Sequence, residues 1–595
     1  MSKEKKQSRL AEFERYAEGR HHLVAVGMIG SAMGAMLSVV PFYYIWLIIR
    51  EALGNGDADL MIGYGWMALA FALLSLLVYI LALLMSHLAA FRIAKNMKKE
   101  MVRHVLSLSP GALDEEGSGR VRRVIQDSVE STHTYIAHNL PDLASMYALP
   151  VAIVALLLIF DWRLGIASMI PVLLAMYVSR AMTGRKNMQE SMEQWQSSMA
   201  DVNNKSVEYV RGISVVKVFQ QTVDSFQSLK GSIDRYSDFC QGYTEMARMP
   251  MSTFFALINS CGIFVMAFAV IIIEFLDGGT VSEDLIVNVI FYVSFASVIT
   301  VLMIRIMFAS DQSYRVDDAL NRIHELLSLK PLEEPDEPVI PDDFTIRFDN
   351  VRFAYSDDAP NAVDGVSLEM RQGTITALVG QSGSGKSTMA GLAARFWDPQ
   401  EGTVSIGGKD VRKIGSKQIR HLESYVFQNN HLIKGTLMEN VRLGKPDATE
   451  DEVRRVLELA QCTDIVAKMP QGLDTLIGPG GVYLSGGEVQ RISIARAILR
   501  DAPIVILDEA TAFADPENEH LIQKAFEQLA KGRTVLLIAH RLTTIRNADQ
   551  ICVMDHGKIL ESGRHDELIA LSGRYSAMWN DYQRALSWKV KGASA

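Results

Sequence analysis

Six long apolar segments occupy the first half of the chain and are separated by polar segments of very unequal length. Most of them reach the roughly 20 residues that an α-helix needs to cross a bilayer. One such run is compatible with a buried core helix or, at the N-terminus, a signal peptide, but six runs predict a helical transmembrane domain of six spans. The predicted spans are Leu23–Ile49, Met61–Ala90, Leu140–Phe160, Leu164–Val178, Met251–Ile273 and Leu285–Phe308.

Lysine and arginine are distributed unequally between the segments that join these spans. Six occur in residues 1–22, eight in 91–134 and nine in 179–250, whereas residues 50–60 contain one and residues 274–284 contain none. Positively charged segments stay on the cytoplasmic side of a membrane. We therefore expect both termini and the two long segments to be cytoplasmic, and the best-matching membrane is a bacterial inner (cytoplasmic) membrane.

The two long polar segments have helical character, which predicts that the spanning helices continue into the cytoplasm. Each pair would be joined by a short transverse element, near Leu106–Leu113 and Gly212–Gln220, able to contact a cytosolic domain. Ionisable residues within spans are functional candidates because burying them is costly. Glu274 and Arg305, however, lie at span ends, where an interfacial position accounts for their charge.

Residues 1–22 are charged, but Leu10, Phe13 and Ala17 share one helical face. This pattern predicts either an elbow helix lying on the membrane surface or a solvated helix.

A proline-rich and acidic segment separates the two halves of the chain. Residues 331–343 contain four prolines and six acidic residues, a composition typical of an extended linker. We expect an N-terminal segment, a transmembrane domain, a linker, a soluble α/β domain with a phosphate-binding loop, and a flexible tail. Their predicted bounds are 1–22, 23–328, 329–343, 344–583 and 584–595.

Composition excludes several other classes of protein. Hydrophobic residues make up 49% of the 595 residues and charged residues 21%, which excludes a disordered chain. The net charge of −9 does not indicate the excess of basic residues that is typical of nucleic-acid-binding proteins, so no nucleic-acid partner is expected. The four cysteines form no CxxC pair, so neither a zinc ribbon nor a disulfide framework is expected.

A glycine-rich loop after a predicted strand is the main chemical motif of the second half. The apolar run 376–380 leads into a GxxxxGK[ST] sequence, in which backbone N–H groups close around phosphate oxygens. The following helix directs its positive end at the same anion. Lys386 is then suited to contact the β- and γ-phosphates of ATP, and Ser387 to bind Mg²⁺. The residues of this predicted site are Gly380, Gln381, Ser382, Gly383, Ser384, Gly385, Lys386, Ser387 and Thr388.

Two further predicted strands end in groups suited to phosphate hydrolysis. The apolar run 504–507 is followed by Asp508 and Glu509, and the run 534–539 by His540. Asp508 is suited to hold Mg²⁺, and Glu509 to polarise the attacking water as a general base. His540 is expected to orient or sense the γ-phosphate.

The segment Leu484-Ser-Gly-Gly-Glu488 resembles the signature motif of ATP-binding cassette (ABC) transporters, and the order of the motifs matches that family across residues 344–580. Six spans preceding one cassette are similar to its exporter-type (type IV) half-transporters. The resemblance implies ATP hydrolysis with Mg²⁺, coupled to movement of a solute across a lipid bilayer. It also implies further nucleotide-site residues: Tyr355 stacking on adenine, Gln428 near Mg²⁺, Asp515 in the D-loop, and Ser485, Gly486 and Gly487 in the signature.

The same resemblance implies a dimer, because one chain carries one cassette and the signature faces ATP bound by the other subunit. A homodimer and a heterodimer with a second half-transporter both remain open. Two positions depart from the family pattern. Glu488 stands where exporters commonly have glutamine, which puts little in doubt. The loop Thr475–Gly481 lacks the glutamates of the exporter X-loop, which puts the details of inter-domain coupling in doubt.

The transported solute is the least determined feature. The stretch 508–519 is similar to that of exporter-fold importers of iron siderophores, such as the yersiniabactin and mycobactin systems. Uptake of a ferric siderophore by alternating access is therefore the favoured hypothesis, and export of a drug, lipid or peptide is the alternative. An ATP-gated channel or a regulatory membrane ATPase is a further alternative of another class.

Overall fold

The structure is a computed structural model, and it divides into two compact units. The first consists of residues 1–104 and 119–328, and the second of residues 105–118 and 329–595. The residues that it describes are 9–183, 186–218, 227–276, 281–356, 358–428, 430–478, 481–508, 516–539 and 542–587.

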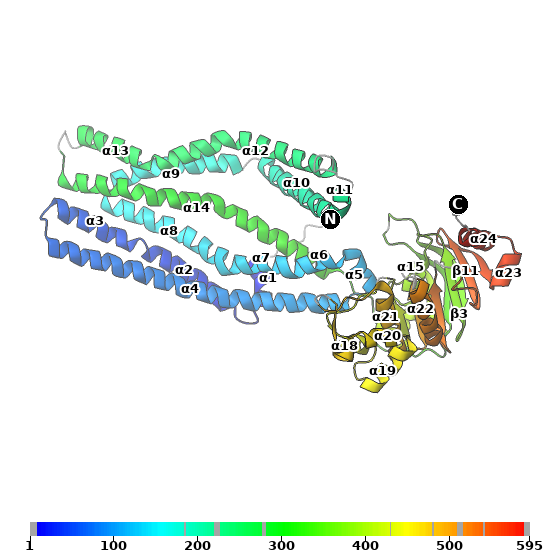
Figure 1. The fold of residues 1–595 in the computed structure, drawn as a ribbon. Coiled ribbons are helices and arrows are strands. Elements are labelled where there is room, and N and C mark those ends of the chain that lie inside the picture. Colours follow the sequence, from blue (N-terminus) through cyan, green and yellow to red (C-terminus); the bar gives the residue numbers. More distant parts are fainter. Residues whose placement is uncertain are drawn as a thin grey trace, which may run out of the picture. The chain divides into compact units, whose positions relative to one another are not determined.

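The first unit is helical, and Figure 1 shows its long helices lying side by side along a common direction. Among the described residues, five segments are long and apolar enough to cross a membrane, and a sixth candidate is a helix pair bent by 52°. The helical transmembrane domain is thus confirmed, whereas the count of six spans depends on taking the bent pair as one span. The five segments are His22–Leu53, Ala58–Ser107, Ser118–Phe160, Trp162–Ala181 and Glu283–Arg305, and the bent pair is Gln227–Asn259 with Cys261–Phe275.

The helices of this unit have the following bounds: α1 Arg9–Tyr16, α2 His21–Leu37, α3 Val40–Leu53, α4 Ala58–Ser107, α6 Ser118–Arg123, η1 Val124–Ser128, α7 Val129–Thr134, η2 Tyr135–Asn139, α8 Leu140–Phe160, α9 Trp162–Thr183, α10 Lys186–Arg211, α11 Ile213–Val218, α12 Gln227–Asn259, α13 Cys261–Ile271, η4 Ile272–Leu276 and α14 Glu283–Ser328. The longest, α4, has 50 residues and therefore a length of about 75 Å. This is more than twice the roughly 30 Å of bilayer hydrocarbon, as expected for spans that continue beyond the membrane.

Side-chain bonds to the backbone account for the bend between α12 and α13. The Asn259 amide donates to the Phe255 carbonyl at 2.8 Å, and the Ser260 hydroxyl donates to the Leu257 carbonyl at 2.7 Å. Polar side chains that bond to the preceding turn in this way bend helices.

The apolar face of α1 packs on protein. Phe13 and Ala17 are buried, and the Phe13 ring lies 6.1 Å from that of Tyr135. A Glu12 carboxylate oxygen lies 2.7 Å from Nε2 of His324 on α14. Two residues of the predicted apolar face, Phe13 and Ala17, are therefore buried within this unit, whereas the side chain of Leu10 lies outside the described part of the chain.

The second unit is an α/β domain. A six-stranded sheet has the strand order β12-β11-β3-β10-β9-β6, a four-stranded sheet has the order β2-β1-β4-β5, and β7 pairs with β8. Within the six-stranded sheet, neighbours are parallel except for the β11–β12 pair. The strands are β1 Ile346–Phe353, β2 Val363–Met370, β3 Ile375–Gly380, β4 Glu401–Ile406, β5 Lys409–Asp410, β6 Glu423–Val426, β7 Gly435–Thr436, β8 Leu476–Ile477, β9 Ile504–Asp508, β10 Thr534–Ile538, β11 Gln550–Asp555 and β12 Lys558–Gly563.

The helices of this unit cover the six-stranded sheet, and the central strands β9 and β10 are buried along their whole length. This burial explains their continuous apolar runs, which are typical of parallel strands covered on both faces. The helices are α5 Pro110–Glu116, α15 Lys386–Ala393, α16 Val411–Ile414, α17 Ser416–Leu422, α18 Leu437–Arg442, α19 Glu450–Leu459, α20 Thr463–Ala467, η5 Gly472–Asp474, α21 Gly486–Arg500, α22 Pro516–Ala530, α23 His565–Ala570 and α24 Arg574–Ser587. The predicted tail beyond Ser587 lies outside the described residues.

The helix α5 packs against the α/β domain of this unit. The Trp397 indole N–H donates to the Glu115 carboxylate at 3.0 Å. Gly111 is buried, and a Cβ atom at this position would lie only 2.3 Å from the Trp397 ring. The first predicted transverse element therefore lies on Trp397. The second, Gly212–Gln220, overlaps α11, and its last two residues lie outside the described residues.

The proline-rich linker is extended but lies on the α/β domain. The Glu334 carboxylate accepts a hydrogen bond from the Ser416 backbone N–H at 2.9 Å and pairs with the Arg395 guanidinium at 3.6 Å. Arg395 is fully buried and also pairs with Asp398 at 3.0 Å. Glu334 of the linker thus helps to neutralise the buried Arg395 guanidinium.

Candidate nucleotide-binding site

The loop between β3 and α15 has the backbone of a phosphate cradle. Gly385, which precedes the first residue of α15, has φ +99°, and a Cβ there would lie 2.3 Å from the Ala362 carbonyl oxygen. Gly383 has φ +80° and open space where its Cβ would be. Backbone N–H groups that face open space at a helix N-terminus are the donors that bind phosphate oxygens.

Lys386 is the first residue of α15, and its ammonium group points back into the loop. The side chain is buried, and Nζ donates to the carbonyl oxygens of Gly380 (3.1 Å) and Gln381 (2.8 Å) and to the Ser384 hydroxyl (3.3 Å). The ammonium group is therefore held inside the cradle by neutral acceptors. A phosphate oxygen is a stronger acceptor for this cation, so the donor set suits a polyphosphate.

Ser387 and Asp508 meet although they are 121 residues apart in the sequence. The Ser387 hydroxyl donates to Asp508 Oδ1 at 3.2 Å. Asp508 ends β9, and the parallel register sets it opposite Ile538, the last residue of β10. A hydroxyl and a carboxylate oxygen side by side are the ligand types that Mg²⁺ prefers, so the residues fit this ion.

Tyr425 is a neighbour of Asp508 that the sequence analysis did not single out. Burial and the nearby Asp508 carboxylate hold the pKa of the Tyr425 phenol above its usual range, and the two side chains are hydrogen-bonded. The phenol therefore stays protonated and supplies a donor to Asp508. The sequence signal was its position at the end of β6, three residues before Gln428.

An aromatic cluster borders the loop. The Tyr355 hydroxyl is hydrogen-bonded to the Thr388 hydroxyl at 2.8 Å, and its ring, 47% exposed, stands edge-on to Phe353 and Trp397 at centroid distances of 5.2 and 5.4 Å. A half-exposed ring in a fixed orientation suits stacking on a nucleobase. Trp397 is the second residue that sequence reasoning missed, and it contacts both Tyr355 and α5.

The signature segment begins α21. Ser485 caps this helix: its hydroxyl accepts from the Glu488 backbone N–H at 3.3 Å, and the Glu488 carboxylate accepts from the Ser485 N–H at 2.9 Å. Glu488 therefore completes a capping box, a role that the glutamine common in exporters can fill as well. Ser485 and Gly486 are exposed, and Gly487 is buried.

The structure brings some predicted residues together and leaves others apart. Among the described residues, no hydrogen bond joins Ser485 to the phosphate loop. Gln428 is exposed just after β6. Glu509, Asp515 and His540 lie outside the described residues, so their assignments remain predictions.

The sequence matches two protein-family models. The model of the ABC transporter transmembrane region matches residues 24–312. The model named ABC transporter matches residues 363–512, which lie in the α/β domain. The chain is 33% identical to an ATP-dependent lipid A-core flippase of Neisseria meningitidis, covering 84% of this chain and 79% of the flippase. The chain belongs to the ABC transporter family.

Further relatives are named for different activities. The chain is 30% identical to an ATP-dependent lipid A-core flippase of Sodalis glossinidius over 93% of this chain and 94% of that protein. It is 32% identical to the mycobactin import ATP-binding/permease protein IrtA of Mycolicibacterium smegmatis over 94% of this chain. The chain spans only 64% of the length of that import protein.

This ABC transporter has one transmembrane region followed by one ATP-binding domain, the arrangement of an exporter-type half-transporter. It is a membrane protein with the ATP-binding domain of an ABC transporter. The resemblance to ABC transporters is confirmed, while the solute and the direction of its movement are not determined by these relatives.

Proposed function

We propose that two half-transporters, identical or related, bind two ATP molecules between them, each between the phosphate loop of one subunit and the signature of the other. The observation that carries this proposal is the assembled loop, with the Lys386 ammonium inside it and Ser387 and Asp508 in contact beside it. The start of α21, exposed at Ser485 and Gly486, is a helix N-terminus suited to a second anion contact. Apart from the capping bonds between Ser485 and Glu488, no hydrogen bond to this helix end is found among the described residues, which suits a phosphate brought by a partner.

Each residue of the site has a proposed role in hydrolysis. Lys386 and the loop N–H groups bind the β- and γ-phosphates, and Tyr355 stacks on adenine. Ser387, Asp508 and Gln428 would hold Mg²⁺, which neutralises charge on the phosphates when bound. Glu509 would polarise the attacking water, and His540 and Asp515 would border the γ-phosphate.

We further propose that α5 transmits nucleotide-driven motion to the membrane helices. It lies on Trp397, which also contacts the Tyr355 ring beside the loop. Since α5 follows α4 directly in the chain, a displacement of the ATP-binding domain moves the end of this spanning helix. Alternating access would result, with the termini and the ATPase domain on the cytoplasmic side of a bacterial inner membrane.

The favoured solute is an iron-charged siderophore, moved inward. Support comes from the mycobactin import protein, which matches 94% of this chain. Flipping of an anionic lipid is the second candidate, because lipid A-core flippases match both membrane region and ATPase domain.

The test compares cells that express wild type or Glu509→Gln, each with a neighbouring half-transporter if one is encoded. Cells receive ferric mycobactin carrying radioactive iron, and cell-associated iron is counted over time. We expect accumulation that depends on Glu509, because this variant should bind ATP without turnover. Equal counts would contradict uptake of this solute. Lower counts in wild type would indicate export instead.

The flippase candidate is tested with purified protein in proteoliposomes that contain fluorescently labelled lipid A. ATP-dependent movement of the label between leaflets, absent in Glu509→Gln, would favour lipid flipping over siderophore uptake.

A further inference from the structure

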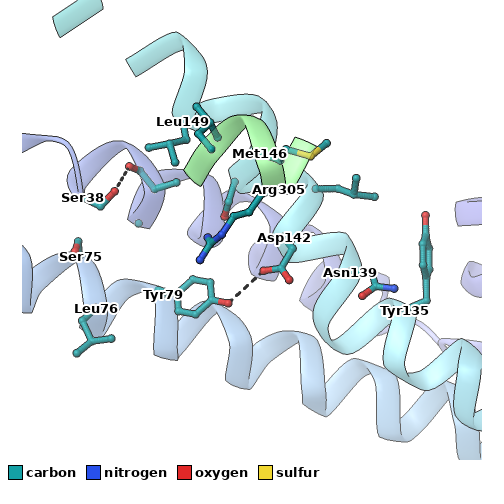
Figure 2. A pocket seen from close by; sticks show the side chains of 15 residues that line it. Ser38, Ser75, Leu76, Tyr79, Tyr135, Asn139, Asp142, Met146, Leu149 and Arg305 are labelled. Atoms are coloured by element: carbon teal, nitrogen blue, oxygen red, sulfur yellow. Dashed lines mark hydrogen bonds between the residues drawn. The ribbon is translucent and has the colours of Figure 1, made fainter. Parts of the chain in front are cut away.

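The transmembrane unit contains a cavity of about 720 Å³, within the range of pockets that bind organic molecules. It lies among α2, α4, η2, α8 and α14. Figure 2 shows its lining from close by. Leu76, Met146 and Leu149 contribute apolar surface. The three serines of the lining already have hydrogen-bond partners: Ser38 and Ser75 each donate to a backbone carbonyl of the preceding turn, and Ser145 donates to the Ser31 carbonyl on α2.

Two of the described lining side chains, Asp142 on α8 and Arg305 on α14, carry a full charge. The Asp142 carboxylate accepts a hydrogen bond from the Tyr79 hydroxyl at 3.3 Å. The Arg305 guanidinium has neither a hydrogen bond nor an ion pair within 4.0 Å to any described residue, Asp142 included. Figure 2 shows it extending toward Tyr79 and Asp142 across the cavity.

A cationic side chain in or near the membrane is costly unless water, a polar group or a ligand satisfies it. Its position at the end of the span Glu283–Arg305 allows an interfacial role, as the sequence suggested. The side chain instead lines the cavity together with Tyr79 and Asp142. The five donors of a guanidinium match the paired oxygens of a carboxylate or phosphate.

We propose that this cavity binds the transported solute, and that Arg305 holds an anionic oxygen group of an amphiphilic molecule whose apolar part lies against Met146 and Leu149. The inference rests on the proposed transport function and adds the chemical class of the solute. Asp142 is a specificity residue in this scheme. The Asp142 carboxylate is positioned by its hydrogen bond from Tyr79. Its negative charge repels the anionic group of the solute, which therefore binds at Arg305.

A siderophore with ionised oxygen ligands and a lipid with a phosphate headgroup share this chemistry. The two sources are separated by two probes, ferric mycobactin and lipid A, whose binding to the detergent-solubilised, full-length transporter is measured by microscale thermophoresis. The variants are Arg305→Gln, Arg305→Lys and Asp142→Asn. The matched control is Arg50→Gln, since Arg50 pairs with Asp284 at 3.4 Å and lies outside the cavity lining.

We expect one probe to bind wild type, and Arg305→Gln to weaken that binding about ten-fold or more, since a charge-assisted bond is lost. Arg305→Lys should retain part of the affinity, which a merely misfolded variant would not. Asp142→Asn should bind several-fold more tightly because a repulsive charge is removed, and Arg50→Gln should bind as wild type does. The probe that binds identifies the source of the anionic group.

Equal binding by Arg305→Gln and wild type would overturn the proposal, as would binding of neither probe. Weakening by Asp142→Asn to the level of Arg305→Gln would refute the anionic class. The Glu509→Gln transport comparison separates this inference from the proposed function. Transport that depends on Glu509, with binding insensitive to Arg305, would refute the site alone. Binding that depends on Arg305, without Glu509-dependent transport, would refute the transport function alone.

Discussion

Replacing Gly111 with alanine should uncouple ATP hydrolysis from transport. The new Cβ would lie 2.3 Å from the Trp397 ring and 2.7 Å from the Phe396 carbonyl oxygen, about 1 Å closer than ordinary contact allows. Because the carbonyl is backbone, the strain is relieved by moving α5 away from the domain. Overpacking of this kind costs about 1–3 kcal/mol, which shifts the docking equilibrium of α5 about 5- to 150-fold.

The assay is the amount of solute moved per ATP hydrolysed in proteoliposomes. The phosphate loop is untouched in Gly111→Ala, so basal ATPase activity should persist while transport per ATP falls several-fold or more. Gly119→Ala is the matched control, since Gly119 lies in the nearby α6 with open space around its Cβ position. Wild-type coupling in Gly111→Ala would refute the reasoning. A parallel loss of coupling in Gly119→Ala would show that the effect is not specific to the Trp397 contact.

Three further predictions concern the ATP-binding domain. Lys386→Ala should lower ATP affinity and turnover at least ten-fold in a nucleotide-binding and phosphate-release assay, because the buried ammonium fills the cradle; an unchanged rate would remove the phosphate-loop assignment. Glu488→Gln should keep ATPase activity and thermal stability near wild type, because an amide oxygen can still accept from the Ser485 N–H, whereas Glu488→Ala should lower the melting temperature by an amount equivalent to about 1 kcal/mol. Burial raises the pKa of Glu423 from 4.5 to about 8; the folded state therefore binds a proton that the unfolded state releases, and the free energy of unfolding should fall as pH rises from about 5 to about 8. Glu423→Gln should flatten this dependence in thermal melts across that range, and an identical pH slope in both proteins would contradict it.

The glycine-rich loop was predictable because its residues are close together in the sequence at a fixed spacing. A glycine-rich loop needs only the residues between Gly380 and Lys386, and the backbone angles of Gly383 and Gly385 are those that the motif requires. Ser387 and Asp508 were each assigned to Mg²⁺ from their motifs, and the structure brings the two side chains into contact, since parallel strands bring their carboxyl ends to one sheet edge. Tyr425 was missed because a tyrosine becomes a donor to Asp508 only when the sheet is assembled and water is excluded.

By itself, the sequence determined the helical membrane half, the α/β half and the glycine-rich loop that we propose binds phosphate. These properties follow from hydrophobic periodicity and from motifs within a few residues of one another, which need no knowledge of distant contacts. Tertiary structure decided the rest. It covered the apolar face of the N-terminal helix, bent the pair at Asn259, and brought Gly111 onto Trp397. It also showed that Arg305, which the sequence placed at the end of a span, lines a cavity. The position of a side chain among other helices depends on packing that no local sequence pattern encodes.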